Sequence, residues 1–339
     1  MMRNLKMILI GVLWLFSSAD HITAQNRPSI SSIDRIRLAE AFHLAEVVGD
    51  SIWKNWHEAP VAVLLITPEY EFLIRHPAPS PDFTLIGYDT LLESEVFYRK
   101  RTQPLDFLAT FPAIAGSLIP VIVVGQAQNT SAKTSTPWVV SLLHEHFHQW
   151  QMSQPDYYEQ VEALGLSRGD QTGMWMLNFP FPYDSSVVQS SFADLSNLLR
   201  KAVQDSKKKR DTPVETYLAA REKFRRLLNP DDFKYFSFQL WQEGMARYTE
   251  YHIARLAASH FRVSGRFRAL LDYTPFADVA NSIHHTIMER LQKARLGESR
   301  RELFYPFGAA EGLLLDNLNP GWRRFYLEEK FRPELYFNK

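Results

Sequence analysis

The chain has 339 residues, of which 45% are hydrophobic and 13% aromatic, a composition that predicts a folded core and excludes a disordered chain. Its 38 basic residues balance its 38 acidic ones, which argues against nucleic acid or an anionic membrane surface as a partner. The absence of cysteine excludes disulfides and thiolate metal sites, so that any metal must be held by nitrogen and oxygen atoms.

Residues 1 to 25 have the pattern of a secretory signal. Arg3 and Lys6 precede the apolar run "MILIGVLWLF", and the polar stretch "SSADHITAQ" follows it. The apolar run is too short to span a bilayer comfortably. We therefore expect a mature chain, residues 26 to 339, that is secreted or periplasmic and is not stably inserted in a membrane.

The first half of the mature chain predicts a helix, a sheet and a second helix. Apolar spacing predicts a helix from 32 to about 56. Between 60 and 125 the segments "VAVLLIT", "YEFLIR", "VFYRK" and "IPVIVVG" are short, apolar and separated by turn residues, which indicates strands. After a polar loop, Thr136 is predicted to cap a helix that begins at Pro137.

The second half is predicted to be mainly helical. Helical segments are expected near 190 to 205, at 213 to 228 and at 232 to 259, with further helix to about 330. The predicted fold class is α+β, in one domain with three parts. These parts are a mixed-sheet lobe with the second helix at 26–152, a helical insertion at 153–235 and a helical lobe at 236–339.

The second helix contains the stretch "HEHFH". His144 and His148 are four residues apart, so they project from one face of the helix and can reach one metal ion. Glu145, displaced by about 100°, can take a proton from a water that the metal activates. His146 points elsewhere and is expected either to pack or to contact a ligand residue, rather than to bind the metal itself. The alternative is a helix whose histidines are partly exposed and whose Glu145 is merely solvated.

Glu243, in the stretch "WQEGMARYTE", is the predicted third metal ligand. It precedes Gly244 and Ala246, whose small side chains permit close approach to another backbone, although glycine disfavours a helix interior. The alternative is an exposed stripe of ion pairs formed by Glu243, Arg247 and Glu250.

Three elements together resemble the gluzincin metallopeptidases, the superfamily of thermolysin and the zinc aminopeptidases in peptidase clan MA. "HEHFHQW" resembles H-E-x-x-H-Q-W, "EGMARYTE" resembles E-G-x-A-x-Y-x-E, and "YPFG" from Tyr305 resembles Y-x-K-G. The sequence departs from the pattern in having Phe307 at the lysine position, no G-x-M-E-N segment, and 94 residues between His148 and Glu243.

The resemblance implies a zincin-like fold and a set of roles. Glu145 would be the general base, Tyr305 a hydrogen-bond donor to the oxyanion, and Glu250 a residue that orients a ligand. His284 and His285 are alternative donors. The implied zinc ligands are His144, His148 and Glu243.

The function implied is that of an exported zinc-dependent hydrolase that cleaves peptide bonds in a peptide or protein, with zinc as the only cofactor. The strand "IPVIVVG" would line the substrate cleft, where an extended peptide could add to a sheet edge. Two alternatives remain open: a catalytically inactive binding protein on the same scaffold, and a zinc hydrolase that acts on a non-peptide amide or ester.

Overall fold

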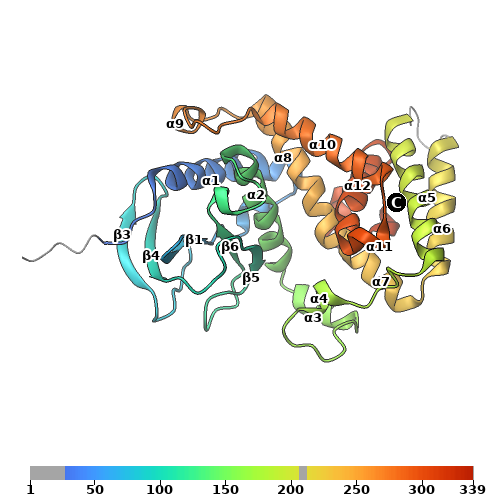
Figure 1. Cartoon of the computed structure of the whole chain (residues 1–339), viewed down its shortest axis with the longest axis horizontal. Helices are drawn as coiled ribbons and strands as arrows, with labels where there is room; N and C mark the ends of the chain where they lie inside the picture. Colours follow the sequence, from blue (N-terminus) through green and yellow to red (C-terminus); the bar gives the residue numbers. More distant parts are fainter. Residues whose placement is uncertain (1–26, 206–211, 339) are drawn as a thin grey trace, which may run out of the picture.

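A computed structural model describes residues 27–205 and 212–338 of the chain (Figure 1). The predicted signal, residues 1 to 25, lies outside the described residues. The described chain combines a mixed sheet with many helices, as the sequence predicted. Within these residues, no helix has the length and apolar content that a membrane crossing requires.

The six strands lie in the order β3-β4-β2-β1-β6-β5. Strands β1 and β6 pair in parallel, and every other neighbouring pair is antiparallel. Every residue of β1 and β6 is buried, which agrees with their uninterrupted apolar sequences. The bounds are β1 Val63–Ile66, β2 Tyr70–Ile74, β3 Thr84–Asp89, β4 Ser94–Lys100, β5 Leu108–Phe111 and β6 Val121–Gly125.

The two edge strands, β3 and β5, were not predicted. Strand β3 is largely exposed and its pairing with β4 shifts register at Gly87, so it lacks the apolar run used to recognise the other strands. Strand β5 has only four residues. The expectation that "IPVIVVG" forms an edge was wrong, because β6 lies between β1 and β5.

Alternate residues of the central strands face two different cores. Val63 and Leu65 join the main core, which they share with residues of helices α1 and α2, whereas Leu64 and Ile66 join a smaller cluster on the other face. Helix α1, Ser32–Ile52, ends four residues earlier than predicted, and a short 3₁₀ turn, Trp56–Glu58, follows it.

Helix α2, Ser135–Met152, carries the histidines and begins two residues before the predicted start. The predicted cap at Thr136 was wrong, because the Thr136 hydroxyl accepts a hydrogen bond from the Thr274 backbone N–H at 3.0 Å instead. Asp272, far along the chain, accepts from the backbone N–H of Ser135 at 3.0 Å and from its hydroxyl at 2.6 Å. A distant carboxylate therefore satisfies the start of this helix.

The predicted helix at 232 to 259 is interrupted by one π-helical turn. It consists of α7 Pro230–Gln239, the π turn Leu240–Gly244 and α8 Met245–His260. The π turn contains Glu243, and such turns occur frequently at functional sites.

The insertion forms two long helices that lie side by side, α5 Ser186–Asp205 and α6 Thr212–Leu227, as predicted (Figure 1). The proposed boundary at residue 235 falls inside α7, and the three-part division of the chain stays a prediction. The other helices are α3 Tyr157–Ala163, α4 Trp175–Asn178, α9 Gly265–Arg268, α10 Phe276–Gln292, α11 Leu296–Ser299 and α12 Phe304–Leu318.

Gly244 and Gly308 bring the π turn into direct backbone contact with α12. A Cβ atom added to Gly244 would lie 2.5 Å from the Cα of Gly308, and one added to Gly308 would lie 2.6 Å from the Cα of Gly244. Neither position has room for a side chain, so the close approach expected at Gly244 is confirmed. This contact fixes the backbone on which Glu243 stands.

Candidate metal centre

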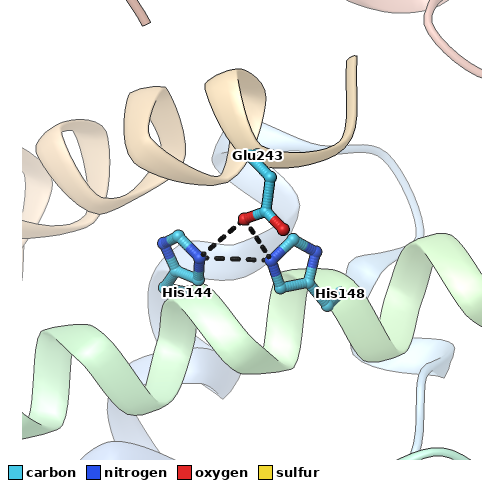
Figure 2. A group of neighbouring side chains, drawn as sticks. All are labelled: His144, His148 and Glu243. Carbon is cyan, nitrogen blue, oxygen red and sulfur yellow. Dashed lines mark hydrogen bonds and ion pairs between the residues drawn. The ribbon is translucent and has the colours of Figure 1, made fainter. Parts of the chain in front are cut away.

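His144, His148 and Glu243 converge, two from α2 and one from the π turn (Figure 2). The two Nε2 atoms are 3.1 Å apart, and Oε2 of Glu243 lies 3.8 Å from Nε2 of His144 and 3.4 Å from Nε2 of His148. Tetrahedral zinc with bonds of about 2.0–2.1 Å separates its ligand atoms by about 3.3 Å. The three atoms therefore form a triangle of the size that one face of such a tetrahedron requires.

The side chain of Gln151 orients His148. The amide nitrogen of Gln151 donates to the backbone oxygen of Trp241 at 3.1 Å, which turns its carbonyl oxygen toward Nδ1 of His148 at 2.7 Å. The amide nitrogen of Gln242 lies 3.1 Å from the same Nδ1, but it is a donor and so makes no hydrogen bond to Nδ1–H, while the Gln242 carbonyl oxygen accepts from the Tyr157 hydroxyl at 3.0 Å. A carbonyl acceptor at Nδ1 favours the tautomer that leaves Nε2 available to a metal.

Glu250 lies beside the other ring nitrogen of His144. Its Oε1 atom lies 2.7 Å from Nδ1 of His144, and its other oxygen forms a close ion pair with Nη1 of Arg247. Glu250 is 5% exposed, so the predicted alternative of an exposed ion-pair stripe does not describe it. The expected proximity of Glu250 to His144 is confirmed, and Nε2 of His144 faces Glu243.

The carboxylates around His144 strongly favour its charged form. Burial opposes protonation, but Glu243 and Glu250 outweigh it and raise the pKa of His144 to about 10. Burial would likewise raise the pKa of Glu243, yet the two histidines lower it well below its ordinary value. The partly buried Glu243 carboxylate beside two imidazoles therefore favours a cation at this point, either a proton on an imidazole or a metal ion.

We predict that zinc binding releases a proton from His144 and is therefore tighter at higher pH. Below the pKa of about 10 the metal-free site holds this proton, so the zinc association constant should rise roughly tenfold per pH unit between about pH 6.5 and 8.5. Competition with a chromophoric chelator measures this constant.

The Glu250→Gln variant provides the matched comparison. Removing its charge lowers the pKa of His144, so the pH dependence should become shallower. An association constant in the unmodified protein that does not change with pH would contradict the protonated His144.

Glu145 is held by the edge strand β5. The hydroxyl of Thr110 lies 2.8 Å from Oε2 of Glu145 and 3.0 Å from its backbone oxygen. Glu145 is 6% exposed and lies outside the group of three ligands, as predicted. Thr110 can donate to only one of the two oxygens at a time, so the carboxylate keeps acceptor capacity for a proton.

Tyr305 lies over the ring of His144. The two ring centroids are 6.5 Å apart with an interplanar angle of 13°, and Nη1 of Arg301 donates to the Tyr305 hydroxyl at 2.7 Å. Burial and the charge of Glu243 raise the pKa of Tyr305 well above its ordinary value. The hydroxyl therefore keeps its proton and remains a hydrogen-bond donor.

The other histidines considered from the sequence do not join His144, His148 and Glu243. His146 stacks on Trp56 with centroids 5.3 Å apart, and burial lowers its pKa to about 4, as expected for a packing residue. His284 contacts the ring of Tyr251, and His285 is exposed. Neither belongs to the group of potential ligands found among the described residues.

Thr110, Gln151 and Arg301 were missed by sequence reasoning. Gln151 follows His148 by three residues, so helical spacing could have suggested its contact. Thr110 and Arg301 come from segments with no recognisable motif, and only the tertiary fold brings them to Glu145 and Tyr305.

We predict that Gly308→Ala destabilises the protein and weakens metal binding. The new methyl group would meet the backbone of the π turn at 2.6 Å, and overpacking of this kind costs about 1–3 kcal/mol of unfolding free energy. Because the turn carries Glu243, zinc affinity should fall as well.

Gly265→Ala is the matched control, because nothing lies within 4 Å of its added Cβ atom. Urea denaturation and zinc titration of both variants measure the two effects. Equal stability and equal zinc affinity in the two variants would contradict the contact.

Comparisons of the chain with protein-family models, curated proteins and solved structures found no match.

Proposed function

We propose that the chain is an exported zinc-dependent metallopeptidase of the gluzincin type, with a zincin-like fold. The observation that carries this proposal is the triangle of His144, His148 and Glu243, whose dimensions suit zinc. Glu250 faces the opposite nitrogen of His144, and His146 packs on Trp56. Three protein ligands leave a coordination position for a reactant, whereas structural zinc sites are closed by four.

A zinc ion bound there would activate a water molecule and polarise the carbonyl of the scissile bond. Glu145 would take the proton of the attacking water and return it to the leaving amine. Tyr305, held protonated and oriented by Arg301, would donate a hydrogen bond to the oxyanion. The mechanism divides these tasks between α2, the π turn and the first turn of α12.

The position of β5 favours a peptide as substrate. This strand is an edge of the sheet, and its Thr110 contacts Glu145 directly. An extended peptide that paired with the free edge of β5 would run beside the general base. This assigns to β5 the role that the sequence suggested for "IPVIVVG".

The test is hydrolysis by purified mature protein. Unfolded casein and mixed peptides should be cleaved, a chelator should abolish cleavage, and added zinc should restore it. Small amides and esters should react more slowly. Activity on the small amides or esters alone would favour the non-peptide hydrolase, and metal binding without any turnover would favour the binding protein.

A further inference from the structure

A cavity of about 320 Å³ lies between α8, α10 and the start of α12. Tyr305 forms part of its wall and stacks on His144, and Arg247 forms another part and pairs with Glu250, the partner of His144. Figure 1 shows the three helices packed together. Tyr305 and Arg247 therefore belong both to the wall of the cavity and to the surroundings of His144.

Arg290, on α10, supplies an uncompensated positive charge to this cavity. Within the described part of the chain it forms no ion pair, because the neighbouring Glu289 pairs with Lys293 at 2.6 Å. The other charges near the cavity are paired, since Arg247 contacts Glu250 and Glu302 lies 3.2 Å from Arg301. The wall of the cavity therefore has one positive charge without an ion-pair partner, that of Arg290.

The remaining wall suits an acidic side chain. Ile283 and Ile287 contribute apolar surface, and Ser282 and Thr286 contribute hydroxyl groups. Methylene groups can pack on the isoleucines while a carboxylate accepts two parallel hydrogen bonds from a guanidinium, the geometry in which arginine binds carboxylates best. Only one nitrogen of Arg247 is engaged by Glu250, so it retains donors for the same ligand.

We propose that Arg290, assisted by Arg247, forms a subsite for a substrate carboxylate in this cavity, which shares Tyr305 with the metal centre. This inference rests on the proposed peptidase function. The carboxylate can be that of a Glu or Asp side chain or that of a peptide C-terminus. Both sources share the chemistry that the subsite recognises.

Paired peptides test this preference. Four internally quenched peptides carry Glu or Gln at the positions flanking the scissile bond, each with a free or an amidated C-terminus. The kcat/KM of the unmodified protein should be about tenfold or more higher for a peptide that offers the recognised carboxylate. A higher kcat/KM for the Glu peptides than for the Gln peptides indicates recognition of a side-chain carboxylate. A higher kcat/KM for the free than for the amidated peptides indicates recognition of the C-terminal carboxylate.

Arg290→Gln should remove this preference while zinc stays bound, and Arg290→Glu should reverse it in favour of Lys-containing peptides. Arg290→Lys should keep part of it. The matched control is Arg262→Gln, because Arg262 is exposed and does not line the cavity. An unchanged preference in Arg290→Gln, or no preference in the unmodified protein, would overturn the subsite.

A binding measurement separates this inference from the proposed function. The same peptides are titrated into the Glu145→Gln variant, where the Glu or free-carboxylate peptide should bind about tenfold tighter than its neutral counterpart. Such discrimination without hydrolysis by the unmodified protein would defeat the peptidase and keep the subsite. Hydrolysis without discrimination in either experiment would defeat the subsite alone.

Discussion

Replacing Glu145 by glutamine is expected to lower kcat by at least about a hundredfold, because general-base catalysis typically contributes 10²–10⁴-fold. Glutamine has nearly the same shape and can still contact the Thr110 hydroxyl, which lies 2.8 Å from the Glu145 carboxylate. It cannot accept the proton of the attacking water. Because Glu145 lies outside the three-ligand group, zinc content should not change.

Elemental analysis and peptide hydrolysis on the same preparation measure the two effects. Glu159→Gln makes the same chemical change at an exposed position of α3 and should leave both unaltered. Normal turnover in Glu145→Gln would rule out the mechanism, whereas loss of zinc would show that Glu145 supports the metal rather than the proton transfer.

Replacing His148 by alanine is expected to abolish both zinc binding and turnover. The change removes one corner of the triangle and leaves the Glu243 carboxylate, which His148 faces at 3.4 Å, without that partner. Because the partly buried Glu243 carboxylate loses this polar neighbour, the free energy of unfolding should fall too.

His285→Ala is the control, because His285 is exposed and lies outside the ligand group. Zinc titration, urea denaturation and peptide hydrolysis report the three losses. A His148→Ala protein that binds zinc as tightly as the unmodified chain would contradict the assigned ligand. Loss of activity in His285→Ala would instead indicate that His285 donates the hydrogen bond to the oxyanion.

The parts of the site that depend on helical spacing could be predicted from the sequence. His144 and His148 are four residues apart on one helix, so their convergence follows from helix geometry alone. The tight approach at Gly244 was also visible, because glycine within a helix is unfavourable without a reason. The chain segment that it approaches, around Gly308, could not be identified from spacing.

The parts that depend on contacts between distant segments could not be predicted. Strand β5 is short and places Thr110 on Glu145, 35 residues later in the chain. Asp272 satisfies the start of α2 from 137 residues away, which made the local cap at Thr136 a wrong choice. The π turn at Glu243 likewise reflects packing against α12 rather than a local signal in the sequence.

The most direct test of the metal site is a crystal structure of the mature protein purified without added zinc, with anomalous data collected above and below the zinc absorption edge. We predict one zinc ion within about 2.0–2.2 Å of Nε2 of His144, Nε2 of His148 and a carboxylate oxygen of Glu243. Density for an ion that leaves the Glu243 carboxylate unbound, or four bonds from protein atoms, would contradict the proposed catalytic centre.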